Sequence, residues 1–337
     1  MEIVMKRLDA VLTSYPGILQ KRLVVAGFTL FFRNSRYFVV SILNNIPTLV
    51  LSVLLLITSQ VHAAKYKDIE HHPDYEHDKF VTEPTDIVRN FRAYMTSFDS
   101  GDDDDGDGTA DYWRVPEFVA YEVRQFDGVL GKGPKRPSPW ITEKDLYRQD
   151  IAPSDASYAY SRAFRSNHKD WYDRGHLCAK FIAWRLGANA DWNTHTMLNA
   201  VPQRHGFNAG IWLDLEEKTA EWADTYNQVW VIAGPVFKDF KPRKWIGEIS
   251  KGELPVAIPD GLFKIVIKNS EVSGEIDTLA FYYPHDEEGY SKGPYDHSKY
   301  LKSIDWIEKQ TGLDFLTALD DEYERKVERK KNKPIWE

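Results

Sequence analysis

The sequence has little cysteine, no excess of positive charge and no long apolar run. Cys178 is the only cysteine in 337 residues, so no disulfide bond can form within the chain. The formal net charge is -8, which is unusual for a protein that neutralises nucleic-acid phosphates over a broad surface. A chain of this charge can still hold a phosphate at a local basic site. Hydrophobic residues make up 42% of the sequence, so a folded core is expected and a disordered chain is excluded.

The longest apolar run, IPTLVLSVLLLI at residues 46–57, is too short to cross a bilayer, which takes about 20 residues. Six lysines and arginines precede it, and Val61-His62-Ala63 places small residues at the spacing that signal peptidase requires. We therefore expect residues 1–63 to be a signal peptide with a long basic leader. The mature protein would then be secreted or periplasmic, with no stable membrane partner. Retention of this segment as a membrane anchor is the alternative.

Polar segments are expected on both sides of the folded part. Residues 64–98 are rich in His, Asp and Glu, which predicts a linker. Its histidines, His71, His72 and His77, lack strict metal-ligand spacing and are predicted to be solvated. Residues 316–337 are highly charged and are typical of a frayed helix or tail.

Residues 99–114 contain the run DSGDDDDGDGTAD, in which carboxylates recur at every second position. Alternate carboxylates on a glycine-containing turn can converge on one hard cation, so Asp103, Asp105, Asp107 and Asp111 are candidate calcium ligands. The segment differs from an EF-hand because Arg114 stands at the twelfth position, where a glutamate would be needed. A solvated acidic loop is the alternative.

One domain is expected between these segments, at residues 115–315. Strand-like runs occupy residues 118–123, 229–233 and 262–267, and apolar residues recur at helical spacing after Asn208. The sequence therefore predicts a mixture of strands and helices.

Four short motifs follow one another within this domain. They are Asp173-Arg174-Gly175-His176, then N-x-x-P-Q from Asn199, then N-x-G-x-W from Asn208, then Glu216. This ordered set resembles the DNA/RNA non-specific endonuclease family. The resemblance implies an α+β protein with the ββα-metal nuclease fold, in which helices flank a central antiparallel sheet.

The chemistry of these residue types agrees with the resemblance. Hydrolysis of a phosphodiester needs a base for water and a cation for the phosphate charge. His176, with an ordinary pKa of about 6.5, is the predicted general base. Asn208 is the predicted ligand of Mg²⁺ or Mn²⁺, because such an ion prefers oxygen ligands and retains several waters. Glu216 follows eight residues later, about 80° around the same helix, and would contact the metal through water.

Other members of the predicted site have more than one interpretation. Asn199 resembles an asparagine that supports the family's site by hydrogen bonding. Arg174 could contact phosphate or could form a structural ion pair with Asp173. An upstream arginine that contacts phosphate in the family would be either Arg148 or Arg162. A downstream arginine found in some members is replaced here by Ala220.

The predicted function is hydrolysis of DNA and RNA by a secreted, metal-dependent endonuclease without strong sequence specificity. An alternative from another class is a catalytically weak, calcium-dependent binding or adhesion protein on a nuclease scaffold, with the acidic segment at residues 99–114 as its functional element. The presence of both His176 and Asn208 favours the enzyme.

Overall fold

The computed structural model describes residues 71–81, 86–103, 108, 111–159, 171–285, 290, 292–331 and 334–336. All of them belong to the unit formed by residues 63–337. The expected signal peptide or anchor at residues 1–63 lies outside the described residues, as do Asp105, Asp107 and Arg162. Among the residues that are described, no helix is long and apolar enough to cross a membrane.

A seven-stranded antiparallel sheet forms the centre of the fold, in the order β1-β2-β3-β6-β9-β10-β11. The strands are β1 (Ile87–Phe91), β2 (Tyr94–Phe98), β3 (Pro116–Arg124), β6 (Gln228–Val236), β9 (Gly261–Asn269), β10 (Ile276–Pro284) and β11 (Leu301–Lys302). The three strand-like runs predicted from the sequence are therefore confirmed as parts of β3, β6 and β9.

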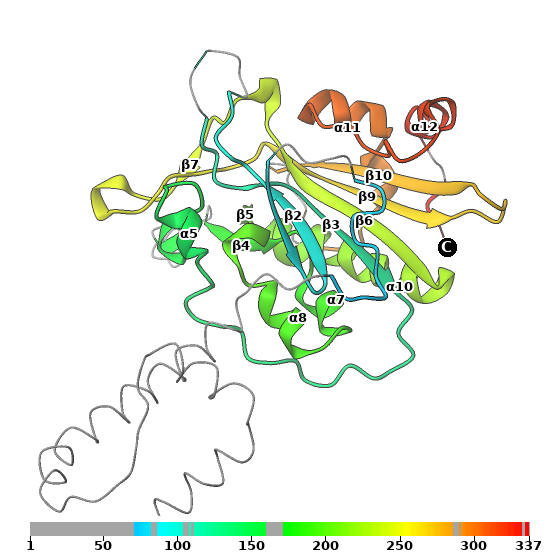
Figure 1. Ribbon diagram of the computed structural model, residues 1–337, viewed down its shortest axis with the longest axis horizontal. Helices are drawn as coiled ribbons and strands as arrows, with labels where there is room; N and C mark the ends of the chain where they lie inside the picture. Colours follow the sequence, from blue (N-terminus) through cyan, green and yellow to red (C-terminus); the bar gives the residue numbers. More distant parts are fainter. Residues whose placement is uncertain are drawn as a thin grey trace, which may run out of the picture. The chain divides into compact units, whose positions relative to one another are not determined.

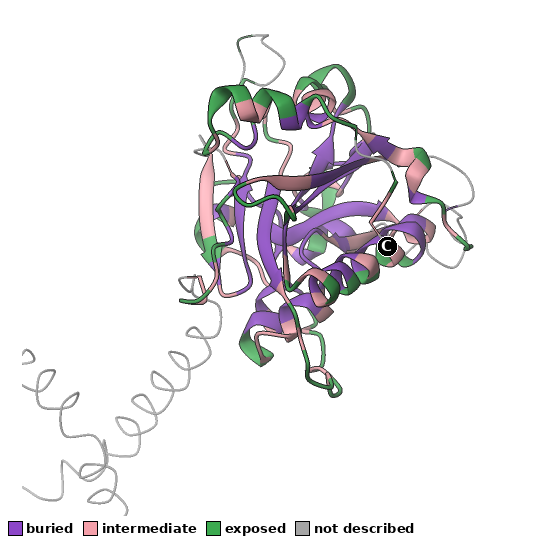
Figure 2. Ribbon diagram, turned by 90° about the vertical axis from the view of Figure 1, so that its right-hand side faces the viewer, coloured by how far each residue is buried: buried purple, intermediate pink, exposed green. Residues whose placement is uncertain are grey.

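Helices cover both faces of this sheet (Figure 1). One face carries α7 (Lys180–Trp184), α8 (Ala188–Asn193) and α10 (Leu213–Tyr226), and the other carries α11 (Ile304–Thr311) and α12 (Asp321–Glu328). Successive residues of a strand point to opposite faces, so β3 sends Val119 and Tyr121 into the first core and Phe118 and Ala120 into the second. The central strands are consequently buried on both sides (Figure 2).

A separate two-stranded antiparallel sheet, here named the β4–β5 hairpin although α7 and α8 lie between its strands in the chain, lies on the first face and leads into the long helix. Its strands are β4 (Tyr172–His176) and β5 (Ala200–Arg204), with His176 opposite Ala200. Helix α9 (His205–Phe207), a π-helical turn (Asn208–Trp212) and α10 follow directly. The remaining named elements of the described chain are α5 (Lys144–Tyr147), the β7 (Trp245–Ile246) and β8 (Val256–Ala257) pair, and short 3₁₀ turns. The predicted fold, an α+β protein with a central antiparallel sheet flanked by helices, is confirmed.

The predicted linker at residues 64–98 is wrong over its second half, because β1 and β2 are strands of the central sheet. Every residue of β2 is buried, polar ones included. Thr96 donates from Oγ1 to the Leu198 carbonyl at 2.9 Å, and Ser97 donates from Oγ to Glu117 at 2.8 Å. These hydrogen bonds compensate for burial, so polar composition misled the prediction.

The predicted charged tail is also more ordered than expected. Asp320 caps the N-terminus of α12 by accepting from the Glu322 amide at 3.1 Å. Leu316 and Val327 are buried in the second core, so the helix is docked on the sheet. The folded domain therefore extends past residue 315.

Candidate functional site

A cleft of about 380 Å³ opens beside the β4–β5 hairpin, next to α7 and the start of α10. It brings together four of the residues predicted from the sequence motifs: Arg174, His176, Asn208 and Glu216. Side chains that the sequence motifs did not assign to the site complete its polar lining, namely Arg136, Asp173, Lys180 and His205.

His176 ends strand β4 with its ring held between aromatic neighbours. The ring centroid lies 4.6 Å from that of Trp140 and 5.2 Å from that of His195. Its Nε2 is buried without a hydrogen-bond partner among the described residues. Burial first, and then the nearby His195, Arg136, Arg174 and Lys180, hold the pKa of His176 well below its ordinary value. The expectation of an unperturbed pKa is therefore wrong, and the imidazole is neutral at pH 7.

Asn208 begins the π-helical turn, and Asp173 of the hairpin orients its side chain. Asn208 Nδ2 donates to Asp173 Oδ2 at 3.2 Å, which leaves Oδ1 as the acceptor of the amide. The same carboxylate oxygen lies 2.7 Å from His205 Nδ1. Asp173 thus joins strand β4 to the helical segment that contains His205 and Asn208.

Glu216 lies in the first turn of α10 and is only 7% exposed. Burial raises the pKa of its carboxyl to about 7, against the opposing effects of Lys264 and of a hydrogen bond from Trp212. The predicted angle of 80° between Asn208 and Glu216 does not apply, because Gly210 between them has φ -115° and ψ -111°, outside the helical region. Both residues nevertheless line the same cleft.

Arg174 forms its ion pair with Asp155, not with the neighbouring Asp173 considered from the sequence. Its guanidinium also lies 4.7 Å from the centre of the Trp140 ring. Lys180 is paired with Asp191 through an Nζ–Oδ2 contact of 2.6 Å. Together with Arg136, these side chains give the cleft a basic lining in a protein whose net charge is negative.

Asn199 lies beneath the cleft and not in its lining. Its Oδ1 accepts from the Cys178 amide at 2.8 Å, and its Nδ2 donates to the carbonyls of Cys178 and Thr194, each at 2.9 Å. All of its hydrogen bonds are to main chain, so it holds the segment that follows His176. This geometry makes Asn199 a positioning residue, not one that touches substrate.

The upstream arginine is where sequence reasoning was least successful. Arg148 is exposed at the end of α5 and does not line the cleft, and Arg162 lies outside the described residues. Arg136 does line it. The basic run KGPKR at residues 132–136 was the available indication. Lys180, four residues after His176, could have been identified from its nearness to the motif.

The cleft fits a hard cation held by few protein ligands. Asn208 Oδ1 and the Glu216 carboxylate are oxygen donors, which Mg²⁺ and Mn²⁺ prefer. Within the described part of the chain, no three His, Cys, Asp or Glu side chains converge in the cleft as a closed metal site would require. A cation there would therefore keep several waters, as Mg²⁺ does.

The acidic segment at residues 99–114 is described only in part. Asp103 Oδ2 accepts from the Gly108 amide at 2.9 Å, and the Asp111 amide donates to the Asp102 carbonyl at 2.8 Å. Asp99 is buried and accepts from the amides of Gly101 and Arg114, each at 2.8 Å. Calcium binding by Asp103, Asp105, Asp107 and Asp111 stays a prediction.

Known proteins are similar to this chain in sequence and in fold. The family model for DNA/RNA non-specific endonuclease matches residues 110–322. Human mitochondrial Endonuclease G is 26% identical over 189 residues, which are 54% of this chain and 61% of that protein. A nuclease of Serratia marcescens is 25% identical over 222 residues, 64% of this chain and 74% of that protein.

A solved structure of the EndoG/EndoGI complex has the same fold, with a TM-score of 0.55 and 22% identity, and the likeness covers 72% of this chain and 90% of that one. The chain thus spans about three fifths of the length of the mitochondrial endonuclease. Because the family match covers well over half of the sequence, the chain belongs to the DNA/RNA non-specific endonuclease family.

Proposed function

We propose that this protein is a metal-dependent endonuclease that hydrolyses phosphodiester bonds in DNA and RNA without strong sequence preference. The observation that carries the proposal is the arrangement of the cleft. A neutral imidazole, two oxygen donors for a cation and several basic side chains line one cavity. Family membership supports the same activity.

His176 is the general base in this proposal. A base must be unprotonated to accept a proton from water, and burial keeps the pKa of His176 low enough for that at neutral pH. Trp140 and His195 pack against the ring and fix its orientation. Asn199 fixes the main chain beyond it.

Asn208 and Glu216 would hold the cation, Asn208 directly and Glu216 through water. A bound Mg²⁺ or Mn²⁺ would neutralise charge that develops on the phosphate and the departing 3′ oxygen. Asp173 fixes the Asn208 amide, so Oδ1 remains available as the ligand atom. The buried Glu216 carboxyl lies ready to orient water.

Arg136 and Arg174 supply positive charge for the phosphodiester. The described lining of the cleft presents positively charged side chains and aromatic rings. Such groups bind phosphates and stack on bases whatever the sequence. Weak sequence preference follows from contacts of this kind. Export of the mature protein to the periplasm or the medium remains part of the proposal.

The test is digestion of supercoiled plasmid and of structured RNA by the purified protein, with Mg²⁺ or with a chelator. We expect metal-dependent cutting of both, with nicked and linear plasmid appearing before short fragments. His176→Ala should reduce the rate about 10²- to 10⁴-fold, the usual contribution of a general base. The matched control is His72→Ala, which changes a histidine outside the cleft. Intact substrates across pH and divalent metals would refute the proposal.

A further inference from the structure

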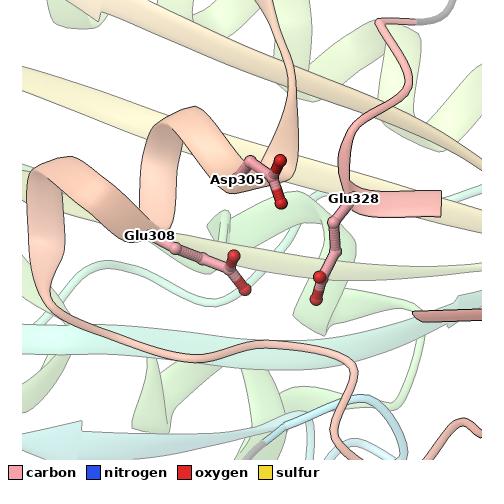
Figure 3. A group of neighbouring side chains, drawn as sticks. All are labelled: Asp305, Glu308 and Glu328. Carbon is pink, nitrogen blue, oxygen red and sulfur yellow. The ribbon is translucent and has the colours of Figure 1, made fainter. Parts of the chain in front are cut away.

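Acidic side chains gather on the face of the sheet opposite the cleft, where α11 and α12 lie. Asp305 and Glu308 of α11 and Glu328 of α12 direct their carboxylates into the same space (Figure 3). One oxygen from each lies within 4.8 Å of the others. Glu328 is shared with a second such group, which Asp314 and Glu324 complete.

Glu328 is the buried centre of this cluster. Glu328 is only 6% exposed, and its Oε1 has no hydrogen-bond partner among the described residues. Its carboxyl lies within hydrogen-bond reach of the Glu308 carboxyl. Two ionised carboxylates repel at such a distance, so the arrangement needs either a shared proton or a cation.

Among the residues that the structure describes, one ion pair brings positive charge to the Asp305, Glu308 and Glu328 group. Arg329 Nε lies 3.8 Å from Asp305 Oδ2, but the arginine side chain is 71% exposed, so water screens the pair. Glu308 uses one oxygen, Oε1, to accept from the Phe315 amide at 2.8 Å. The buried oxygen Oε1 of Glu328 is therefore available to a further partner.

We propose that Asp305, Glu308 and Glu328 bind a divalent cation, calcium by preference, with Asp314 and Glu324 beside them as further ligands. The donors are all carboxylate oxygens, which suits a hard cation and excludes a sulfur- or nitrogen-liganded transition metal site. Calcium accepts six to eight oxygens in flexible geometry, whereas magnesium requires a near-ideal octahedron. Carboxylates that come from two helices and from the segment between them suit the flexible coordination of calcium better than the octahedron of magnesium.

The cation would join α12 to α11 and so hold the C-terminal helix on the sheet. Glu324 and Glu328 lie beyond residue 322, where the family match ends. The site thus combines residues inside the matched region with two from the segment beyond it, and its role is stability, not hydrolysis.

Calcium titration of the chelator-treated full-length protein tests the proposal, by calorimetry and by thermal unfolding. Glu328→Gln and Glu308→Gln each remove one ligand charge, and the second keeps an acceptor for the Phe315 amide. Glu322→Gln, on the exposed side of α12, is the matched control. Any calcium bound at the cleft or at residues 99–114 is common to all four proteins, so differences report this site alone.

We expect wild type and Glu322→Gln to bind one more Ca²⁺ per chain than Glu328→Gln or Glu308→Gln. Calcium at 100 times its dissociation constant raises the folding equilibrium constant about 100-fold through one site. The midpoint of unfolding should therefore rise by several degrees more in wild type than in the two site variants. Equal stoichiometry and equal thermal shifts in all four proteins would overturn the proposal and assign the cluster to a shared proton. Equal affinity for magnesium would overturn the preference for calcium.

Discussion

Arg136 and Lys180 bring positive charge to the cleft in different ways. Lys180 is already paired with Asp191 at 2.6 Å, whereas Arg136 is exposed and lines the cleft from a loop. A phosphate that enters the cleft can therefore gain more from Arg136. A hydrogen bond to a charged group contributes about 1.5–3 kcal/mol.

From this difference we expect Arg136→Gln to lower kcat/KM on DNA about 10- to 100-fold. Steady-state kinetics on a labelled duplex measure the effect. Arg148→Gln, which removes an exposed arginine outside the cleft, should leave kcat/KM unchanged. Equal rates for wild type and Arg136→Gln would show that substrate does not contact this arginine.

Asn199 is expected to matter for stability as much as for catalysis. Asn199→Ala leaves two carbonyls and one amide of buried main chain without partners, at a cost of roughly 3 kcal/mol. Urea unfolding should show this loss. Asn193 is buried to a similar degree, but its Nδ2 has no partner in the described structure, so Asn193→Ala should cost less than half as much. Similar losses for the two variants would contradict the positioning role.

Some site residues could be predicted from the sequence because they lie in a short, ordered set of motifs. His176, Asn208 and Glu216 are separated by at most 40 residues, and the hairpin and α10 bring them together. Arg136 reaches the cleft from a loop outside these motifs. The Glu308 and Glu328 pair could not be anticipated, because it depends on the packing of two helices against each other.

At the scale of elements, the π-helical turn Asn208–Trp212 sets the distance between the proposed metal ligand and Glu216. Gly210 allows this turn to press against the chain at Tyr290, whose carbonyl accepts from the Ile211 amide at 3.0 Å. A Cβ at position 210 would lie 1.7 Å from the Tyr290 carbonyl oxygen. The backbone would have to move, because the obstacle is main chain and not a flexible side chain.

We therefore expect Gly210→Ala to shift Asn208 relative to α10. The variant should lose about 1–3 kcal/mol of stability through overpacking, and its kcat should fall more than tenfold. Thermal unfolding and Mg²⁺-dependent kinetics test both effects. Gly131→Ala is the control, since a Cβ there meets nothing within 4 Å. A fully active Gly210→Ala protein would show that the turn tolerates displacement.

Strands that are buried on both faces of the sheet were the elements that the sequence predicted best. β3, β6 and β9 are mostly apolar and almost entirely buried, so their strands were evident. β2 contains Thr96 and Ser97 and lies in a polar stretch, yet hydrogen bonds to distant main chain and Glu117 allow its burial. Such long-range partners leave no trace in local composition, which is why the N-terminal strands were mistaken for a linker.

At the scale of the whole molecule, the central sheet separates two regions of different chemistry. The cleft lies on the face of α7 and α10, and the acidic cluster lies between helices on the other face. Substitutions that remove acidic ligands beneath α12 should therefore leave nuclease kinetics intact. This separation allows hydrolysis and stability to be measured independently.

His77 links the N-terminal segment to the sheet and should make the stability of the whole fold sensitive to acid. It is 2% exposed, its Nδ1 accepts from the Glu122 amide at 2.9 Å, and its Nε2 lies 3.0 Å from the Arg92 carbonyl. Burial lowers its pKa to about 3, against the opposing effect of the Arg92 carbonyl, while His71, His72 and Arg124 lower the pKa further.

Protonation of His77 therefore favours the unfolded chain, in which its pKa is about 6.5. The stability that the neutral ring contributes is fully present above that pKa and is lost as the pH falls toward the folded-state value. One such group lowers the free energy of unfolding by about 2 kcal/mol between pH 7 and pH 5. Urea unfolding at the two pH values tests this. The free energy of unfolding should fall by about 2 kcal/mol more in wild type than in His77→Gln, because glutamine cannot titrate. An equal pH dependence in the two proteins would mean that the pKa of His77 is the same in the folded and unfolded states, in conflict with its buried, hydrogen-bonded position.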